Sequence, residues 1–379
     1  MKKLLPEVCT IQYGFPFDSA KFSDSDGMPL IRIRDVVRGY SETYTTEEYK
    51  SEYIVHENDL LIGMDGEFNI AKWGKTPALL NQRVCRLAPK DSIDKDYLFY
   101  FMPIALKRIE EKTPFVTVKH LSAKELNKIE IPVLPLEKQG KIAETLSKVD
   151  ELIAFRDQQL AKLDELVKAR FVEMFGNPIE NTMNWPKKLL RDITTKIGSG
   201  ATPKGGRESY PNAGVSLIRS MNVYDGQFLY KDLAHLTDEQ ATQLNGVTVE
   251  AEDVLVNITG ASVARSCVVP KDVLPARVNQ HVAIVRCNRE LLNPIFTNKM
   301  FINNEFKKAL LSIGESGGAT RQAITKKQLE ELSVVVPPLS IQNEFFTFSE
   351  CVDQQKQTVQ QSLEKLELMK KVLMQEYFG

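Results

Sequence analysis

The sequence predicts an α+β fold with two α/β domains, each followed by a long helix, and the two helices pair as an antiparallel coiled coil. Three observations lead to this fold. The chain repeats one plan twice, each copy begins with short strand-like segments, and each copy ends in a long amphipathic segment. The 379 residues are 42% hydrophobic and 26% charged, which is typical of a globular protein of two or three domains.

The repeat is clearest at the end of each copy. Residues 126–139 read LNKIEIPVLPLEKQ and residues 329–342 read LEELSVVVPPLSIQ, an offset of 203 residues that continues without a gap to Phe-Gly at 175–176 and 378–379. Weaker matches lie upstream in the same order: Leu30-Ile31-Arg32 with Leu217-Ile218-Arg219, Asp59-Leu60-Leu61 with Asp253-Val254-Leu255, Gly66 with Gly260, and Asn81-Gln82 with Asn279-Gln280. The offset only grows along the chain, as longer loops in the second copy would produce.

The first part of each copy predicts a mixed α/β domain, at residues 1–135 and 185–335. Short runs rich in β-branched residues, such as 29–33, 58–63 and 282–286, are bounded by Gly, Asn, Asp and Pro, which is typical of strands between turns. Helical patterns occupy 96–111 and 293–312. We expect a curved, largely antiparallel sheet in each domain.

The second part of each copy predicts a spacer helix, at residues 136–176 and 336–379, with a linker at 177–184. A strand containing proline precedes each helix. Each helical segment would be about 55 Å long at 1.5 Å per residue, too long for its apolar stripe to be covered by one neighbouring domain. We therefore expect the helices to pair, although each could instead pack only on its own domain. The predicted coiled-coil core is Ile142, Val149, Ile153, Leu160, Leu163, Val352, Val359, Leu363 and Leu366.

Patterns for catalysis and metal binding are present only as fragments. Gly314-Glu315-Ser316-Gly317-Gly318 fits Gly-x-Ser-x-Gly but lacks the strand that should precede a nucleophile. The five cysteines include no Cys-x-x-Cys pair and the four histidines lack ligand spacing, so we expect neither a disulfide framework nor a metal site. No catalytic residue is predicted.

The net charge leaves nucleic-acid binding open, and the hydrophobicity argues against a membrane. The net charge of −1 does not by itself indicate nucleic-acid binding. Neither a transmembrane segment nor a signal peptide is apparent, so we expect no membrane contact and a cytoplasmic location.

The ordered motifs resemble the specificity subunit of a type I restriction-modification enzyme over the whole chain. The residues that carry the resemblance are Pro135-Leu136-Glu137-Lys138-Gln139 and Pro338-Leu339-Ser340-Ile341-Gln342 at the helix starts, Gly198-Ser199-Gly200-Ala201-Thr202-Pro203, the Asn-Gln pairs and the Phe-Gly ends. The resemblance implies two target recognition domains that each read half of a split DNA sequence. It also implies helices that space the half-sites and dock two methyltransferase subunits, through which restriction and translocation subunits join. No cofactor is implied in this chain; S-adenosylmethionine, ATP and Mg²⁺ would be bound by the partner subunits.

Candidate DNA contacts are the cations and amides that read bases or hold phosphates. In the first domain they are Lys21, Arg32, Arg34, Asn81, Gln82, Arg83, Lys119 and His120. In the second they are Thr202, Lys204, Arg207, Arg219, Asn222, Asn279, Gln280, Arg321 and Gln322. The repeated Asn-Gln pairs could equally be structural, since domains that read different sequences should differ in their base contacts.

Three other functions stay open from the sequence. The chain could be a non-catalytic adaptor that binds proteins through two α/β modules on a coiled-coil rod. It could be a hydrolase that uses Ser316. It could also serve a complex that methylates DNA without restricting it. Salt-sensitive DNA binding would separate the first of these from a specificity subunit, because phosphate contacts release counterions.

Overall fold

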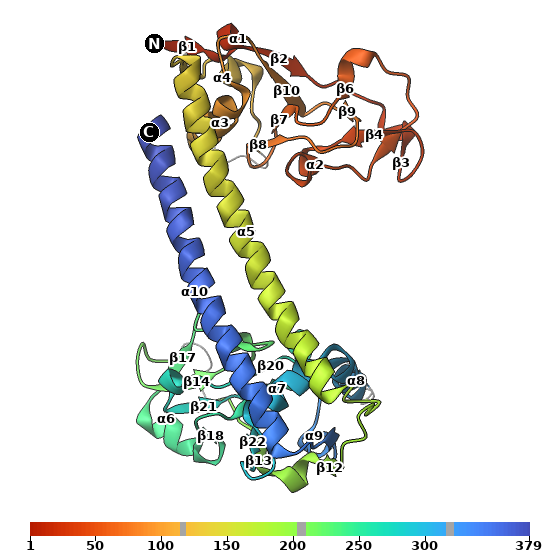
Figure 1. Ribbon diagram of the computed structural model, residues 1–379, viewed down its shortest axis with the longest axis vertical. Helices are drawn as coiled ribbons and strands as arrows, with labels where there is room; N and C mark the ends of the chain where they lie inside the picture. The colour runs from red at the N-terminus through yellow and green to blue at the C-terminus, as the bar shows by residue number, and fades with distance from the viewer. Residues whose placement is uncertain (114–118, 203–209, 316–321) are drawn as a thin grey trace. The chain divides into compact units, whose positions relative to one another are not determined.

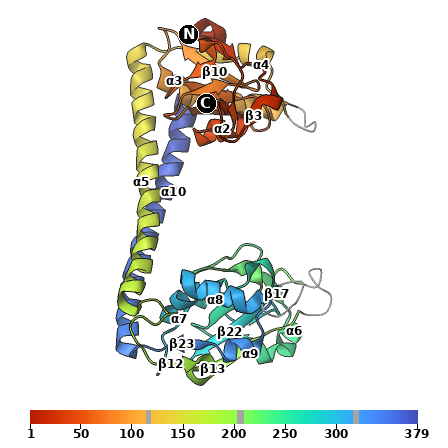
Figure 2. The same cartoon turned by 90° about the vertical axis from the view of Figure 1, so that its right-hand side faces the viewer.

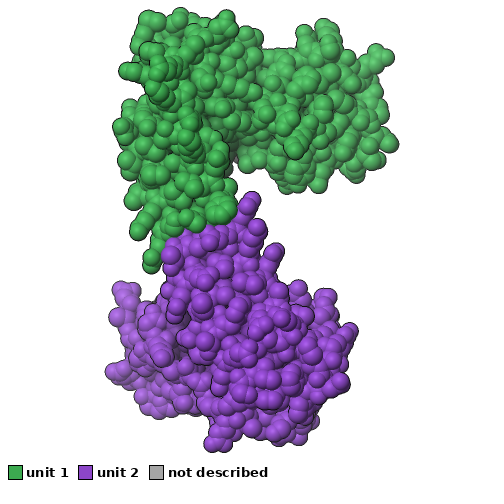
Figure 3. Space-filling model, viewed as in Figure 1, with its two compact units in different colours: residues 1–157, 360–379 green, residues 158–359 purple. Residues whose placement is uncertain are grey.

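The computed structural model describes residues 1–113, 119–202, 210–315 and 322–379 and forms two compact units (Figure 3). Unit 1 comprises Met1–Asp157 and Gln360–Gly379, and unit 2 comprises Gln158–Val359. Each unit therefore contains half of each long helix. The sequence-based division placed the helices outside the domains, whereas in the structure each helix half packs into the core of a unit.

Unit 1 contains two larger sheets and one strand pair. The pair is β1-β11, and the sheets have the orders β2-β10-β7-β8 and β3-β5-β4-β9-β6 (Figure 1). The strands are β1 (Lys2–Leu4), β2 (Cys9–Tyr13), β3 (Phe22–Ser23), β4 (Met28–Ile31), β5 (Tyr44–Thr45), β6 (Ile54–Val55), β7 (Leu60–Gly63), β8 (Asn69–Lys72), β9 (Ala78–Leu80), β10 (Val84–Pro89) and β11 (Glu130–Pro132). The shorter helices are α1 (Leu5–Val8), α2 (Ile33–Arg38), α3 (Lys95–Lys112) and α4 (Ala123–Asn127).

Unit 2 repeats most of this topology, but among its described residues the second sheet has no counterpart of β3, and it has one added strand pair. The orders are β12-β23, β13-β22-β19-β20, β17-β14-β21-β18 and β15-β16. The strands are β12 (Lys187–Leu189), β13 (Thr194–Ser199), β14 (Val215–Ile218), β15 (Val223–Tyr224), β16 (Gln227–Phe228), β17 (Ala234–Leu236), β18 (Thr248–Val249), β19 (Val254–Asn257), β20 (Ser266–Val268), β21 (Ala276–Val278), β22 (Val282–Cys287) and β23 (Ser333–Val335). The shorter helices are α6 (Asp238–Gln243), α7 (Pro294–Ile302), α8 (Asn304–Glu315) and α9 (Lys326–Glu330).

The expectation of one curved sheet in each domain is wrong. Each unit instead divides its longer strands between two sheets. Most pairings are antiparallel, but β4 pairs with β9 and β14 with β21 in parallel. Such pairs join segments far apart in the chain, so the turn signals that predicted short strands could not assign their partners.

The long helices are α5 (Leu136–Phe175) and α10 (Leu339–Phe378), and they lie side by side in Figures 1 and 2. In unit 1, Lys370 Nζ lies 2.6 Å from Asp150 Oδ1. In unit 2, Arg170 Nη2 lies 3.1 Å from Glu344 Oε1. The first part of each helix therefore meets the last part of the other, which is an antiparallel pairing.

The predicted core positions of the helix pair are buried to different degrees. Val149, Val352, Val359 and Leu363 are buried, and Ile142, Ile153, Leu160, Leu163 and Leu366 are half-buried. The helices also pack on the globular parts: Leu146 joins the core of unit 1, and Phe171 and Phe345 join that of unit 2. Helix pairing and packing on the domains thus both occur. Within the described residues, no helix has the length and apolar content to span a bilayer.

The glutamine of each Pro-Leu-x-x-Gln motif fixes the start of a long helix. Gln139 is fully buried; its Oε1 accepts a hydrogen bond from the backbone N–H of Asp94 (2.8 Å), and its Nε2 donates to the carbonyls of Leu134 (2.7 Å) and Ser92 (3.1 Å). Gln342, also fully buried, makes the same three bonds to Asn293 N–H (2.9 Å), Pro337 O (2.7 Å) and Leu291 O (3.0 Å). Asp94 and Asn293 are the N-caps of α3 and α7, so each glutamine connects two helix starts.

Candidate nucleic-acid interface

Three chain segments converge in each unit through the same backbone hydrogen bonds. In unit 1, Met64 N–H donates to Arg83 O (2.9 Å), Gly66 N–H to Lys119 O (2.9 Å) and Leu121 N–H to Met64 O (2.7 Å). In unit 2, the corresponding bonds run from Ile258 to His281 (3.0 Å), from Gly260 to Gln322 (3.0 Å) and from Ile324 to Ile258 (2.8 Å). We call each of these places the convergence site of its unit.

The convergence site of unit 1 carries charged side chains. His120 Nδ1 lies 2.5 Å from Asp65 Oδ1, and Arg83 lies 3.6 Å from Asp65 through Nε and 3.3 Å from His120 through Nη1. About half of the Arg83 side chain is exposed, against 19% of Asp65. Arg83 has a φ of 74°, a backbone conformation that non-glycine residues rarely adopt and that often marks functional sites.

The convergence site of unit 2 carries hydroxyl, imidazole and amide groups. His281 Nδ1 lies 2.5 Å from Thr259 Oγ1, and His281 Nε2 lies 3.2 Å from Gln280 Nε2. Gln280 also contacts Thr202, and Gln322 donates to Glu315 Oε1 (2.7 Å). These groups adjoin a groove of about 620 Å³ lined by Ser220, Met221, Tyr224, Thr259, Gly260, Ala261, Ser262, Arg265, His281, Gln322 and Ala323.

The Asn-Gln pairs divide into a structural and an exposed residue. Asn81 and Asn279 are buried, and Asn279 Oδ1 accepts a hydrogen bond from the backbone of His281 (3.0 Å). A Cβ on Gly14 would stand 2.0 Å from the carbonyl oxygen of Asn81, so glycine is required at this close approach. Gln82 and Gln280 are exposed. The repeated asparagines therefore belong to the framework, and only the glutamines can reach a partner.

The other predicted DNA contacts fall into three groups. Lys21, Arg32, Arg34 and Thr202 are exposed, Lys119 bonds the carbonyl of Glu110 (2.9 Å), and Arg219 bonds the carbonyl of Asp232. The prediction for Asn222 is wrong, because its side chain is fully buried and donates to the carbonyls of Leu229 (2.8 Å) and Lys231 (3.2 Å). Lys204, Arg207 and Arg321 lie outside the described residues.

Sequence reasoning missed the residues that complete the two convergence sites. Asp65, Thr259 and His281 were not among the candidates, nor was Arg265, which lies over the ring of Tyr224 at 4.2 Å. The repeat contained the necessary signal, because Asp65 and Thr259 each precede the matched glycine, and Arg83 and His281 each follow the Asn-Gln pair.

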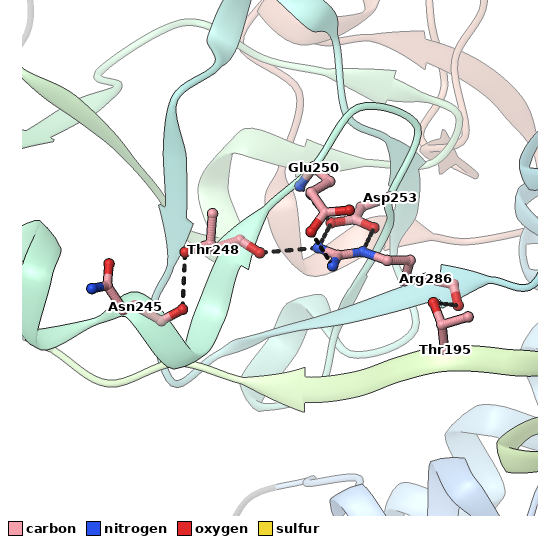
Figure 4. Close-up of polar contacts among 6 residues, drawn as sticks. All are labelled: Thr195, Asn245, Thr248, Glu250, Asp253 and Arg286. Atoms are coloured by element: carbon pink, nitrogen blue, oxygen red, sulfur yellow. Dashed lines mark hydrogen bonds and ion pairs between the residues drawn. The ribbon is translucent and has the colours of Figure 1, made fainter.

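An arginine–aspartate pair connects the two sheets of each unit. Arg286 on β22 contacts Asp253 through Nε (2.8 Å) and Nη2 (2.9 Å), contacts Glu250, and donates from Nη2 to Thr248 O on β18 (3.1 Å), as Figure 4 shows. These hydrogen bonds raise the pKa of Arg286 and keep it charged. Arg86 on β10 makes the matching contacts to Asp59 (3.0 Å) and to Ile54 O on β6 (2.8 Å).

Comparison with known proteins places this arrangement in a family. The sequence model for the type I restriction modification DNA specificity domain matches residues 1–165 and again 183–368. The chain belongs to this family. It is a type I specificity subunit with two target recognition domains, and so binds DNA as part of a restriction-modification system.

Relatives with the same description match nearly the whole chain. The EcoBI specificity subunit of Escherichia coli is 29% identical over 93% of this chain and 80% of its own length. The MjaVIII specificity subunit of Methanocaldococcus jannaschii is 22% identical over 91% of this chain and 87% of its own length.

Solved structures show the same fold. The specificity subunit from M. genitalium aligns with a TM-score of 0.60 at 14% identity, covering all of this chain and 96% of that one. A chain from a structural study of type I complex assembly aligns with a TM-score of 0.59 at 16% identity, covering all of this chain and 97% of that one.

The described part of this specificity subunit shows no arrangement that holds a metal ion: no three His, Cys, Asp or Glu side chains are grouped for one there. The buried thiols are also poor nucleophiles. Burial raises the pKa of Cys85 and Cys267 to about 12 and that of Cys287 to about 11, which disfavours the reactive thiolate.

Proposed function

We propose that this specificity subunit reads a DNA target in two parts, one with each unit, and that it performs no catalysis itself. The observation that carries the proposal is the pair of convergence sites, which share one hydrogen-bonded framework but present different side chains. A protein that reads two different half-sites needs this combination, because the framework positions the readers and the side chains select the bases.

The side chains at both sites have the required chemistry. Arginine forms two hydrogen bonds to guanine, and glutamine does so with adenine. The exposed Arg83 would make the first kind of contact in unit 1, and the exposed Gln280 would make the second in unit 2 by exchanging its contacts to Thr202 and His281 for the base. Exposed cations outside the convergence sites, such as Lys21 and Arg34, suit phosphate contacts, which add affinity without selecting a sequence.

We propose that the outer faces of α5 and α10 bind two methyltransferase subunits. In unit 1 these faces carry exposed apolar side chains, which are depleted from surfaces that face only water and are typical of interfaces. They are Leu152, Phe155, Leu368, Met369 and Val372. The restriction and translocation subunits would join through the methyltransferases. S-adenosylmethionine, ATP and Mg²⁺ would bind to those partners and not to this chain.

The test is to express the chain with the methyltransferase subunit of its own system and to sequence the modified DNA. We expect one motif with two specified parts separated by a fixed unspecified gap. Native mass spectrometry of the purified complex should give two methyltransferase subunits per chain, and DNA binding should weaken steeply as salt rises. A continuous motif, or salt-insensitive binding with no modification, would refute the proposal and favour the protein adaptor.

A further inference from the structure

The convergence site of unit 1 contains an arginine that is held in place before any ligand arrives. Arg83 lies two residues after the buried Asn81 and has a left-handed backbone conformation, and its carbonyl accepts the framework hydrogen bond from Met64 N–H. Its guanidinium lies beside the Asp65 carboxylate and the His120 imidazole. An arginine fixed at both ends loses less conformational freedom on binding than a free surface arginine does.

Asp65 contacts the Nε side of the Arg83 guanidinium and leaves Nη2 accessible. Asp65 Oδ2 lies nearest to Nε, at 3.6 Å, and about half of the Arg83 side chain is exposed. Nε faces the Asp65 carboxylate and Nη1 also contacts His120 Nδ1 at 3.3 Å, so Nη2 and the second N–H of Nη1 remain to form hydrogen bonds to a planar acceptor pair. Guanine presents such a pair, O6 and N7, in the major groove.

Unit 2 provides an internal comparison at the same framework position. His281 replaces Arg83 and Thr259 replaces Asp65, so this site has neither the guanidinium fork nor the carboxylate. The backbone bonds around it are the same. The backbone at the compared position differs in one respect, because Arg83 has a left-handed φ and His281 does not, so the two sites differ in side chain and in the direction in which the side chain leaves the chain.

We propose that Arg83 reads a guanine in the half-site recognised by unit 1, and that Asp65 positions it. This inference rests on the proposed two-part reading of DNA. Arg83 is the specificity-determining residue, because it touches the base. Asp65 is a positioning residue that acts through Arg83, with His120 supporting the carboxylate.

The test uses the complete complex with its methyltransferase subunits, after the wild-type motif has been mapped by sequencing modified DNA. Modification rates are then measured on duplexes in which each specified base pair is changed in turn. We expect Arg83→Gln and Arg83→Lys to reduce discrimination at one G·C pair by roughly 5- to 150-fold and to leave the other positions unchanged. Asp65→Asn should weaken discrimination at that same pair by a smaller factor.

Two control variants define the specificity of the effect. Arg38→Gln removes another exposed arginine of unit 1 and should change nothing. His281→Ala should alter preference only in the other half of the motif. If Arg83→Gln lowers the melting temperature of the complex, its loss of discrimination could reflect lost stability. Arg83→Lys keeps the charge and then separates lost base reading from lost stability.

Three results would overturn the inference. The first is a motif in which neither half specifies a G·C pair. The second is a two-part motif whose base preferences survive both Arg83 variants. The third is a uniform loss at all positions, which would make Arg83 a phosphate contact. A modified sequence that is not in two parts would instead refute the proposed function itself.

Discussion

Units 1 and 2 share a backbone framework but differ in the side chains that face a partner. The order of the four-stranded sheet β2-β10-β7-β8 recurs as β13-β22-β19-β20, and the glutamines that begin the long helices and the hydrogen bonds of the convergence sites occur in both units. The residues at the convergence sites and on the outer helix faces differ. The contacts that occur in both units stabilise the fold. The side chains that differ between the units lie on the surfaces that would face a partner.

The comparison also shows that repeated contacts need not have equal strength. Arg286 forms two bonds to Asp253, of which only 1% is exposed. Arg86 forms one bond to Asp59, of which 27% is exposed, and relies more on backbone carbonyls. Unit 2 therefore depends more on its ion pair than unit 1 does, because its carboxylate is more deeply buried and accepts more hydrogen bonds from the arginine.

The largest expected effect is the loss of this ion pair. Asp253→Ala should lower the free energy of unfolding of unit 2 by about 3–5 kcal/mol, because Arg286 loses two charge-assisted hydrogen bonds and the backbone N–H of Glu250 loses its acceptor. Asp59→Ala should lower that of unit 1 by only about 1–2 kcal/mol, because water can replace the exposed carboxylate. Hydrogen exchange measured on peptides from each unit would resolve the two values, with Asp192→Ala as an exposed control. Equal losses would show that the two pairs are equivalent.

Loss of the glutamine at the start of each long helix should lower the free energy of unfolding equally in the two units. Gln139→Ala and Gln342→Ala should each destabilise their own unit by about 2–4 kcal/mol, because each leaves one buried N–H and two carbonyls without a partner. The same exchange measurement applies, and Gln361→Ala on the surface of α10 is the matched control. A loss confined to one unit would contradict the view that repeated contacts belong to the framework.

The exposed faces of the long helices differ in chemistry between the two units. Phe155 is 57% exposed, and the residue 203 positions later is the polar, exposed Thr358. Phe155→Asp should weaken binding of a methyltransferase subunit by about 1–2 kcal/mol, or roughly tenfold, because apolar contact is lost. Thr358→Asp should change binding by less than about 0.5 kcal/mol. Titration followed by sedimentation would measure both, and equal effects would mean that the two faces bind alike despite their chemistry.

The smallest effect concerns thiol reactivity and requires no change in stability. At pH 8, alkylation should modify exposed Cys351 first. Cys85 and Cys267 should react only when their units open, because burial raises each pKa to about 12 and so removes nearly all thiolate at this pH. Mass spectrometry over time would give the rates. Asp253→Ala should accelerate Cys267 without affecting Cys85, and acceleration of both would contradict separate units.

The long helices could be predicted from the sequence because of the repeat, but the contacts between distant segments could not. Residues 136–176 were predicted as one helix, and α5 spans Leu136–Phe175, because the apolar spacing and the absence of internal proline are local properties. The division into two sheets depends on parallel pairs such as β4 with β9, which no local pattern encodes.

The candidate site was only partly predictable for a similar reason. Arg83 and Gln280 were predictable as a cation and an amide, but Asp65 was not, since a carboxylate beside DNA is expected to repel it unless the carboxylate holds a cation. The amide of Asn222 resembles a base-reading group in the sequence, but in the structure it donates to backbone carbonyls in a buried turn. Whether a polar side chain faces inward or outward depends on tertiary packing, which residue type alone does not reveal.

The division of α10 between the units sets an order of folding during synthesis. Unit 2 is one continuous segment, whereas unit 1 also requires residues 360–379, which are made only after all of unit 2. Until then, Tyr97 and Phe101 lack the ring of Phe378, whose centroid finally lies 5.2 and 5.8 Å from theirs. The first unit to leave the ribosome is therefore the last to complete its core, and it is the one at risk of aggregation while the chain is being made.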